Sequence, residues 1–155
     1  MLDHSHPSQH VLFLCTGNYY RSRFAEILFN ALIANTSLKW IACSRGIATE
    51  RGVRNIGPLS PYARLGLLSR GIPLPHPLPF PQQLQREDLA SADRIIALKE
   101  AEHRPLLAER FPACGVDIEF WHIHDLDQAP AKIALSEIES EVQKLLLQLT
   151  MDALT

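Results

Sequence analysis

Four short stretches rich in apolar residues alternate along this chain with segments whose apolar residues recur at helical spacing. Continuous apolar runs of this length are typical of strands buried on both faces, and strands that alternate with helices pair into parallel sheets. The pattern therefore predicts one α/β domain built on a doubly wound parallel sheet. The predicted strands are His10–Leu14, Leu38–Ala42, Arg94–Ala97 and Val116–Trp121.

Helix signals fall between these strands. After the first strand, apolar residues recur at the spacing of one helical face, with Ser22 at the expected N-cap. Ser60 and Pro61 mark the start of a second helix, and Gly71 marks its end. Five prolines in Pro73–Pro81 indicate a rigid connector. The remaining predictions are a loop at Arg45–Gly57 and helices at Arg86–Ala92, Ala101–Phe111 and around Leu135–Leu149.

Length and charge limit the possible functions. The 155 residues suit one domain, and we expect residues 1–9 to be a disordered lead to a domain over residues 10–155. A formal charge of -2 favours neither nucleic acid nor an anionic membrane as a partner. The polar start lacks a signal-peptide pattern and no apolar run has the length of a membrane span, so we expect a cytoplasmic location. The oligomeric state is left open by the sequence.

Cys15 begins the segment with the most specific chemistry, Cys-Thr-Gly-Asn-Tyr-Tyr-Arg-Ser, which leaves the first predicted strand and enters a helix. Successive backbone N–H groups in a tight loop at a helix N-terminus bind anions. Arg21 adds a planar fork that matches two phosphate oxygens, and Gly17 lets the backbone turn and approach a ligand. The predicted phosphate-binding residues are Thr16, Gly17, Asn18, Tyr19, Tyr20 and Arg21.

The positive field of this loop favours the thiolate form of Cys15, which is the nucleophilic form of a cysteine. A thiolate can attack phosphorus to form a cysteinyl phosphate, which water then hydrolyses. We expect Ser22 to hydrogen-bond the sulfur and improve it as a leaving group. Asn18 is expected to hold the loop through bonds from its side chain to the backbone.

The segment Val-Leu-Phe-Leu-Cys-Thr-Gly-Asn at 11–18, with Arg21-Ser22 and Ala25-Glu26 after it, resembles the low-molecular-weight protein tyrosine phosphatases. The likeness covers most of the chain and continues through Ser44-Arg45-Gly46, Pro58–Gly71, Ala92–Leu98 and Trp121–Asp127. The resemblance implies a four-stranded parallel sheet flanked by helices, in a flavodoxin-like arrangement. It also implies hydrolysis of phosphotyrosine in a protein, or of a small aryl phosphate, with no metal or other cofactor.

Several positions depart from the family's usual pattern. Tyr20 stands where the family often has a second cysteine, and Arg23 stands where a proline is usual. The acid loop lacks both the proline and the aromatic residues that commonly follow its aspartate. Tyr19 either stacks on a substrate ring or is a partly buried tyrosine. These departures bear on substrate preference more than on the reaction.

The reaction requires an acid that protonates the leaving oxygen and then acts as a base toward water. Asp125 follows the fourth predicted strand, at the same sheet edge as Cys15, and lies four residues after Trp121. The resemblance assigns the family's catalytic aspartate to Asp125. Asp127 is the alternative, because the family's proline is missing from this loop.

Other residues carry weaker signals. His122 and His124 alternate along the end of the fourth strand, but two histidines are too few for a zinc site. Two interpretations are open for Arg45, Arg51 and Arg54. They form a basic rim that attracts a phosphorylated protein, or they belong to a solvated loop.

Two other functions remain open. An arsenate reductase can share this loop and fold, but it needs relay cysteines near the first thiol, and Cys43 and Cys114 are not close in sequence. We expect both to be core or strand-end thiols, since three scattered cysteines do not form a disulfide framework. A non-catalytic module that binds phosphate or phosphotyrosine would need neither Cys15 nor an acid, although the chain has both.

Overall fold

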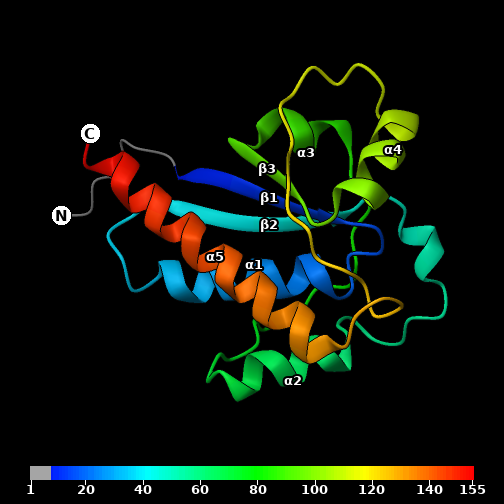
Figure 1. Cartoon of the computed structure of the whole chain (residues 1–155), viewed down its shortest axis with the longest axis horizontal. Coiled ribbons are helices and arrows are strands. Elements are labelled where there is room, and N and C mark those ends of the chain that lie inside the picture. The colour runs from blue at the N-terminus through cyan, green and yellow to red at the C-terminus, as the bar shows by residue number, and fades with distance from the viewer. Residues whose placement is uncertain (1–7) are drawn as a thin grey trace.

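The computed structural model describes residues 8–155 and contains a four-stranded parallel sheet in the order β2-β1-β3-β4. The strands are β1 (Gln9–Cys15), β2 (Trp40–Gly46), β3 (Arg94–Ala97) and β4 (Glu119–Phe120). The helices are α1 (Arg21–Ile33), α2 (Pro61–Ser69), α3 (Arg86–Ser91), α4 (Glu100–Arg110) and α5 (Ala131–Ala153), with a short 3-10 helix at Thr49–Gly52. Helices lie on both sides of the sheet, which confirms the predicted doubly wound α/β fold (Figure 1).

The central strand β1 is buried on both faces, which explains its continuous apolar sequence. Its side chains alternate between the faces: Val11 and Phe13 pack in the core formed with α1, α2 and α5. Leu12 and Leu14 pack in the second core, formed with α3 and α4. Both cores therefore fix the position of the strand that ends at Cys15.

The strand register brings several loops to one edge of the sheet. β1 ends at Cys15, which lies opposite Gly46 of β2, while Leu14 pairs with Ala97 of β3. Because parallel strands all end at the same edge, the loops that follow β1, β3 and β4 meet there, as ligand-binding loops do in folds of this kind. Functional residues are therefore expected in the loops at this edge.

The observed β1 is one residue longer at each end than predicted, and the bounds of two other strands differ by more. β2 covers Trp40–Gly46 instead of the predicted Leu38–Ala42, because its seven residues pair with all of β1. Its second half contains polar residues, so the apolar pattern did not predict it. The predicted loop at Arg45–Gly57 therefore contains the end of β2 and the 3-10 helix. Within the predicted strand Val116–Trp121 only two residues are β4, since this edge strand pairs only with Ile96 and Ala97.

The predicted disordered lead reaches too far into the domain. Residues 1–7 lie outside the described part of the chain, but Gln9 already belongs to β1, and its N–H donates to Lys39 O at 2.9 Å. Strand pairing therefore begins before residue 10. Between residues 8 and 155, no helix is both long and apolar enough to cross a membrane.

The two predicted helix caps had different outcomes. Ser60 caps α2 as predicted, because its hydroxyl accepts the N–H of Tyr62 at 3.2 Å. Ser22 is not an N-cap: α1 begins at Arg21, two residues earlier than that cap requires, and the cap position is Tyr20, which makes no side-chain cap bond. The hydroxyl of Ser22 instead faces Cys15.

Candidate active site

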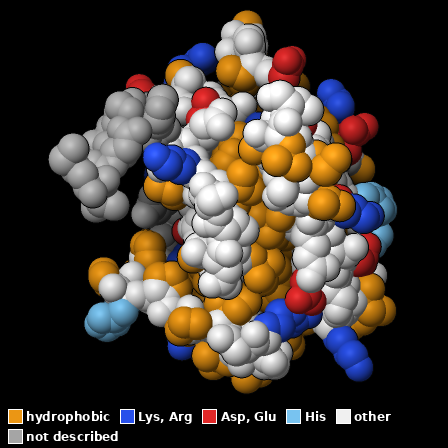
Figure 2. All heavy atoms as spheres, turned by 90° about the vertical axis from the view of Figure 1, so that its left-hand side faces the viewer, with side chains coloured by type: hydrophobic (Ala, Val, Ile, Leu, Met, Phe, Trp, Pro, Cys, Tyr) orange, Lys and Arg blue, Asp and Glu red, His pale blue; other side chains and the backbone are white. Residues whose placement is uncertain are grey.

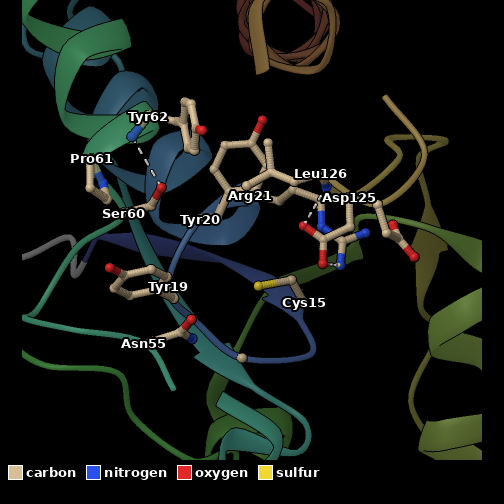
Figure 3. A pocket seen from close by; sticks show the side chains of 12 residues that line it. Cys15, Tyr19, Tyr20, Arg21, Asn55, Ser60, Pro61, Tyr62, Asp125 and Leu126 are labelled. Carbon is tan, nitrogen blue, oxygen red and sulfur yellow. Dashed lines mark hydrogen bonds and ion pairs between the residues drawn. The ribbon is translucent and has the colours of Figure 1, made fainter. Parts of the chain in front are cut away.

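A cavity of about 270 Å³ opens beyond the carboxyl end of β1. Its lining comes from three segments distant in sequence: the candidate phosphate loop (residues 15–21), residues 55–62, and the candidate acid loop (residues 125–128). Cys15 is only 3% exposed, and Figure 3 shows its sulfur directed into the space between Tyr19 and Arg21. The cavity thus collects most of the residues that the sequence singled out, while Thr16, Asn18 and Ser22 do not line it.

A larger hollow of about 600 Å³ lies at the opposite end of the sheet, where its lining includes Gln9, Trp40 and Leu149. Figure 2 views the molecule from that end and shows hydrophobic side chains gathered there. None of the candidate catalytic residues lines this hollow. Chemistry, rather than size, therefore identifies the smaller cavity as the candidate active site.

The backbone of the candidate phosphate loop is arranged to bind an anion. The N–H groups of residues 16–20 find no acceptor among residues 8–155. They precede the N-terminus of α1, whose first N–H groups also lack intrahelical acceptors and carry partial positive charge. An anion held in this loop would accept these free N–H groups, as in other strand-to-helix phosphate sites.

Asn18 holds the loop in this shape. Its backbone has a φ of +54°, a left-handed conformation that asparagine tolerates better than most residues. Its side chain donates to Ser22 Oγ and Ser44 Oγ, both at 2.9 Å, and accepts the N–H of Gln82 at 2.9 Å. One buried amide therefore joins the loop to α1, to β2 and to the residue that follows the proline-rich connector.

Ser22 contacts the candidate nucleophile directly. Its Oγ lies 2.9 Å from Cys15 Sγ and also accepts a hydrogen bond from Asn18 Nδ2. When Cys15 is a thiolate, the serine hydroxyl must be the donor in the contact with sulfur. This geometry stabilises negative charge on the sulfur.

Arg21 is held from three sides although it is only 2% exposed. Its Nη1 donates to Ile123 O at 3.1 Å, and its Nη2 donates to Glu102 Oε2 at 2.5 Å and lies 3.5 Å from Asp125 Oδ2. Burial acts to lower the pKa of Arg21, but Cys15 and the two carboxylates outweigh it and raise that pKa. The guanidinium therefore stays charged beside the sulfur.

Both candidate acids line the cavity, in different environments. Asp125 Oδ1 accepts the N–H of Leu126 at 2.9 Å, while its other oxygen faces Arg21 (Figure 3). A proline after the aspartate would lack the N–H that orients the carboxylate here. Asp127 also lines the cavity but forms no ion pair with any described residue. Of the two candidate acids, only Asp125 lies within ion-pair distance of Arg21 among the described residues.

Lys99 supports the acid loop from the end of β3. Its Nζ donates to Gln128 Oε1 at 3.0 Å, although its side chain is largely buried. Gln128 in turn donates its backbone N–H to Asp125 O at 3.0 Å. These two contacts brace a loop that has no proline after its aspartate.

Sequence reasoning missed Glu102 and His103, in the first turn of α4. Glu102 pairs with Arg21 and also lies 2.7 Å from His103 Nε2. Burial opposes its ionisation, but the hydrogen bond from His103 and the charge of Arg21 lower the pKa of Glu102 to about 2. Their position could have been predicted from the topology, because α4 follows β3 at the same sheet edge as Cys15. A buried arginine also needs an acidic partner, which pointed to a carboxylate at that edge.

Aromatic residues form the walls of the cavity. Tyr19 and Tyr62 line it, and Tyr19 is fixed by donating its hydroxyl to Ile56 O at 2.7 Å. Tyr20 also lines it, but its buried hydroxyl has no partner among the described residues. Burial, and then the nearby Asp125, raise the pKa of Tyr20 to about 12, so its hydroxyl remains protonated.

Residues with weaker sequence signals lie elsewhere. The rings of His122 and His124 meet edge to face at 4.8 Å, and residues 8–155 contain no group of three or more potential ligands that could hold a metal ion. Arg45 pairs with Asp88 at 3.3 Å and does not line the cavity, so it is not part of a basic rim there. Arg51, in the 3-10 helix after β2, and Arg54, which follows that helix, are both exposed.

Comparison with known proteins gives consistent results. The family model described as low molecular weight phosphotyrosine protein phosphatase matches residues 10–153. The low molecular weight phosphotyrosine protein phosphatase of Pongo abelii is 33% identical over 120 residues, which cover 74% of this chain and 72% of the relative. The protein-arginine-phosphatase of Bacillus subtilis (strain 168) is 30% identical over 101 residues, which cover 65% of this chain and 62% of the relative.

The fold has similar solved structures as well. The crystal structure of YfkJ from Bacillus subtilis superposes with a TM-score of 0.80 at 25% sequence identity. The match covers 96% of this chain and 98% of YfkJ, so the sheet and its flanking helices are shared over nearly the whole length of both.

Proposed function

Because this chain belongs to the low-molecular-weight phosphotyrosine protein phosphatase family, we propose that its cavity binds a phosphotyrosine side chain of a protein and hydrolyses it through a phosphorylated Cys15. The enzyme class follows from the family: the chain is a cysteine-dependent phosphomonoester hydrolase. The substrate and the roles of individual residues are the proposal. The observation that carries it is that Cys15, Arg21 and Asp125 line one cavity.

In the first step, the thiolate of Cys15 attacks phosphorus while the bond to the tyrosine oxygen breaks. The free N–H groups of the phosphate loop and the fork of Arg21 hold the three non-bridging oxygens, and they bind most tightly where charge develops in the transition state. Asp125 gives its proton to the departing phenolate. The products are a tyrosine and cysteinyl phosphate at Cys15.

In the second step, the Asp125 carboxylate takes a proton from water as the water oxygen bonds to phosphorus. The sulfur–phosphorus bond breaks and the electron pair returns to Cys15. The hydroxyl of Ser22, 2.9 Å from the sulfur, stabilises the thiolate that leaves. Inorganic phosphate is released and both residues recover their starting protonation states.

The walls of the cavity favour an aryl group as the part of the substrate next to phosphorus. Tyr19, Tyr62 and Leu126 surround the entrance with aromatic and apolar surface. An aromatic ring packs well between such side chains, whereas an alkyl phosphate such as phosphoserine is shorter and lacks a ring to stack. Small aryl phosphates fit the same cavity.

The cysteines argue against arsenate reduction by a thiol relay. Cys43 pairs in register with Leu12, three residues before the pair Cys15–Gly46, which corresponds to about 10 Å along the strands. Cys114 lies in the segment between α4 and β4 and does not line the cavity that holds Cys15. Both pack against the apolar core on the α3 and α4 side. Neither is placed to attack the sulfur of Cys15.

The test is hydrolysis of matched peptides that carry phosphotyrosine, phosphoserine or phosphoarginine, with reductant and a metal chelator present. We expect phosphotyrosine to be the preferred substrate and Cys15→Ser to abolish its turnover. The phosphoarginine peptide is included because one relative is a protein-arginine-phosphatase. Preference for that peptide would overturn the assigned substrate but not the reaction. Phosphate binding by wild type without any turnover would overturn catalysis itself.

A further inference from the structure

A chain of hydrogen bonds behind the phosphate loop is not needed by the reaction just described. Arg21 donates to Glu102, and Glu102 Oε2 lies 2.7 Å from His103 Nε2. The same ring nitrogen lies 3.2 Å from Thr16 Oγ1, in the phosphate loop. The backbone N–H of Lys99 donates to the other ring nitrogen, Nδ1, at 3.1 Å. Arg21 and Thr16 are therefore linked through two residues of α4.

The contacts of His103 determine where its proton lies. Because Nδ1 accepts the N–H of Lys99, that nitrogen carries no proton, and the remaining proton of a neutral ring is on Nε2. Full burial lowers the pKa of His103, which agrees with a neutral ring. Nε2–H therefore donates to Glu102, with Thr16 Oγ1 as a second, longer acceptor.

The contacts of Arg21 with Glu102 and Ile123 leave part of its guanidinium free to bind phosphate. Of the five guanidinium N–H groups, one on Nη1 is bonded to Ile123 O and one on Nη2 to Glu102. The other three form no hydrogen bond with a described residue, although Nη2 also lies 3.5 Å from Asp125 Oδ2. The two bonds also fix the plane of the guanidinium. A planar fork recognises phosphate oxygens only when it is correctly oriented, so what fixes its plane affects catalysis.

We propose that Glu102 and His103 are a positioning pair, which holds the guanidinium of Arg21 and the Thr16 side of the phosphate loop in the orientation that binds the transferring phosphoryl group. Neither residue touches the substrate. The inference rests on the proposed role of Arg21 as a phosphate ligand. It extends the site to a helix whose residues do not line the cavity.

Conservative and disruptive variants at each position test the pair with an aryl phosphate substrate. Glu102→Ala is expected to lower kcat/KM about 10- to 100-fold, mainly through kcat, because a charged hydrogen bond to Arg21 is lost. Glu102→Gln keeps an acceptor and should lose less. His103→Gln presents an amide N–H near the position of Nε2 and should retain more activity than His103→Leu. Glu100→Gln is the matched control, since Glu100 is exposed on the same helix and pairs with Arg104.

The pH profile separates positioning from support of the fold. The groups that face Glu102 are the charged Arg21 from α1 and the neutral, titratable His103 from its own helix, with Asp125 further away on the acid loop. Loss of the His103 hydrogen bond raises the pKa of Glu102 from about 2, so kcat/KM of His103→Leu relative to wild type should fall further as the pH drops from about 6 to 4. This extra fall should vanish in the double variant His103→Leu/Glu102→Gln.

Binding of inorganic phosphate, followed by calorimetry, gives a readout that needs no turnover. Glu102→Ala should bind phosphate at least about 10-fold more weakly than wild type. If Arg21→Ala binds phosphate as well as wild type does, the proposed function fails. If Arg21→Ala loses binding while folded Glu102→Gln and His103→Leu match wild type in binding, kcat/KM and pH profile, only the positioning pair is overturned. Circular dichroism establishes that each variant is folded, and Glu102→Gln replaces Glu102→Ala if the latter unfolds.

Discussion

The sulfur of Cys15 and the hydroxyl of Ser22 lie 2.9 Å apart, across the turn by which β1 leads into α1. The serine oxygen is itself held by Asn18, so its position relative to the sulfur is fixed from both sides. The sequence assigned Ser22 both to the helix start and to the sulfur. Only the contact with sulfur is found.

Removal of this contact should slow the second chemical step more than the first. Ser22→Ala deletes a hydrogen bond to the leaving thiolate, and we expect kcat to fall about 10-fold. Since cysteinyl phosphate would then accumulate, rapid-mixing experiments should show a larger burst of phenol than in wild type. Ser91→Ala, on the exposed side of α3, is the control. An equal slowing of both steps would contradict the role assigned to Ser22.

The two aspartates of the acid loop should differ strongly in their effect. Asp125→Asn is expected to lower kcat for phenyl phosphate about 100- to 10,000-fold, the usual contribution of a positioned acid. The loss should be smaller for a nitrophenyl phosphate, whose phenolate leaves without help. Asp127→Asn is the matched control and should remain near wild type for both substrates. The opposite order would make Asp127 the acid.

Gly46 should tolerate no side chain, because a Cβ there would collide with the backbone of the phosphate loop. A Cβ at this position would lie 2.9 Å from Thr16 O and 2.6 Å from Thr49 Cγ2. Gly46→Ala would displace the loop, and we expect kcat/KM to fall about 10- to 100-fold. Thr49→Ser removes Cγ2 but leaves the backbone clash, so adding it to Gly46→Ala should not restore activity. Full recovery in the double variant would show that the loop had not moved.

Glu102 should make stability depend on pH. Its pKa is lowered to about 2 in the folded state, so its stabilising contribution is present above its unfolded pKa and is lost as the pH falls toward 2. After a discount for the 32% of its side chain that is exposed, we expect Glu102→Gln to lower the free energy of unfolding at pH 7 by about 1–2 kcal/mol. Denaturant unfolding from pH 7 to pH 2.5 should show this difference shrinking. A difference that is constant with pH would contradict the lowered pKa.

The boundaries of β2 could not be predicted from the hydrophobic pattern of the sequence. Leu38–Ala42 was predicted from its apolar residues, whereas the strand observed runs over Trp40–Gly46. Ser44 is buried in that strand because its hydroxyl bonds Asn18 and Glu26. Those partners come from other elements, and no local pattern of hydrophobicity contains them.

Features that depend on neighbours along the chain are readable from the amino-acid order: an apolar central strand, the helix start at Ser60, and one continuous loop from Cys15 to Arg21. Backbone geometry and local hydrogen bonds govern such features, so the spacing of nearby residues in the sequence is enough to predict them. Folding is needed to show that Asp125 faces Arg21 and that Glu102, 81 positions away, pairs with it. Contacts of this kind arise because parallel strands end at one edge of a sheet, and that packing brings together residues that no spacing in the sequence relates.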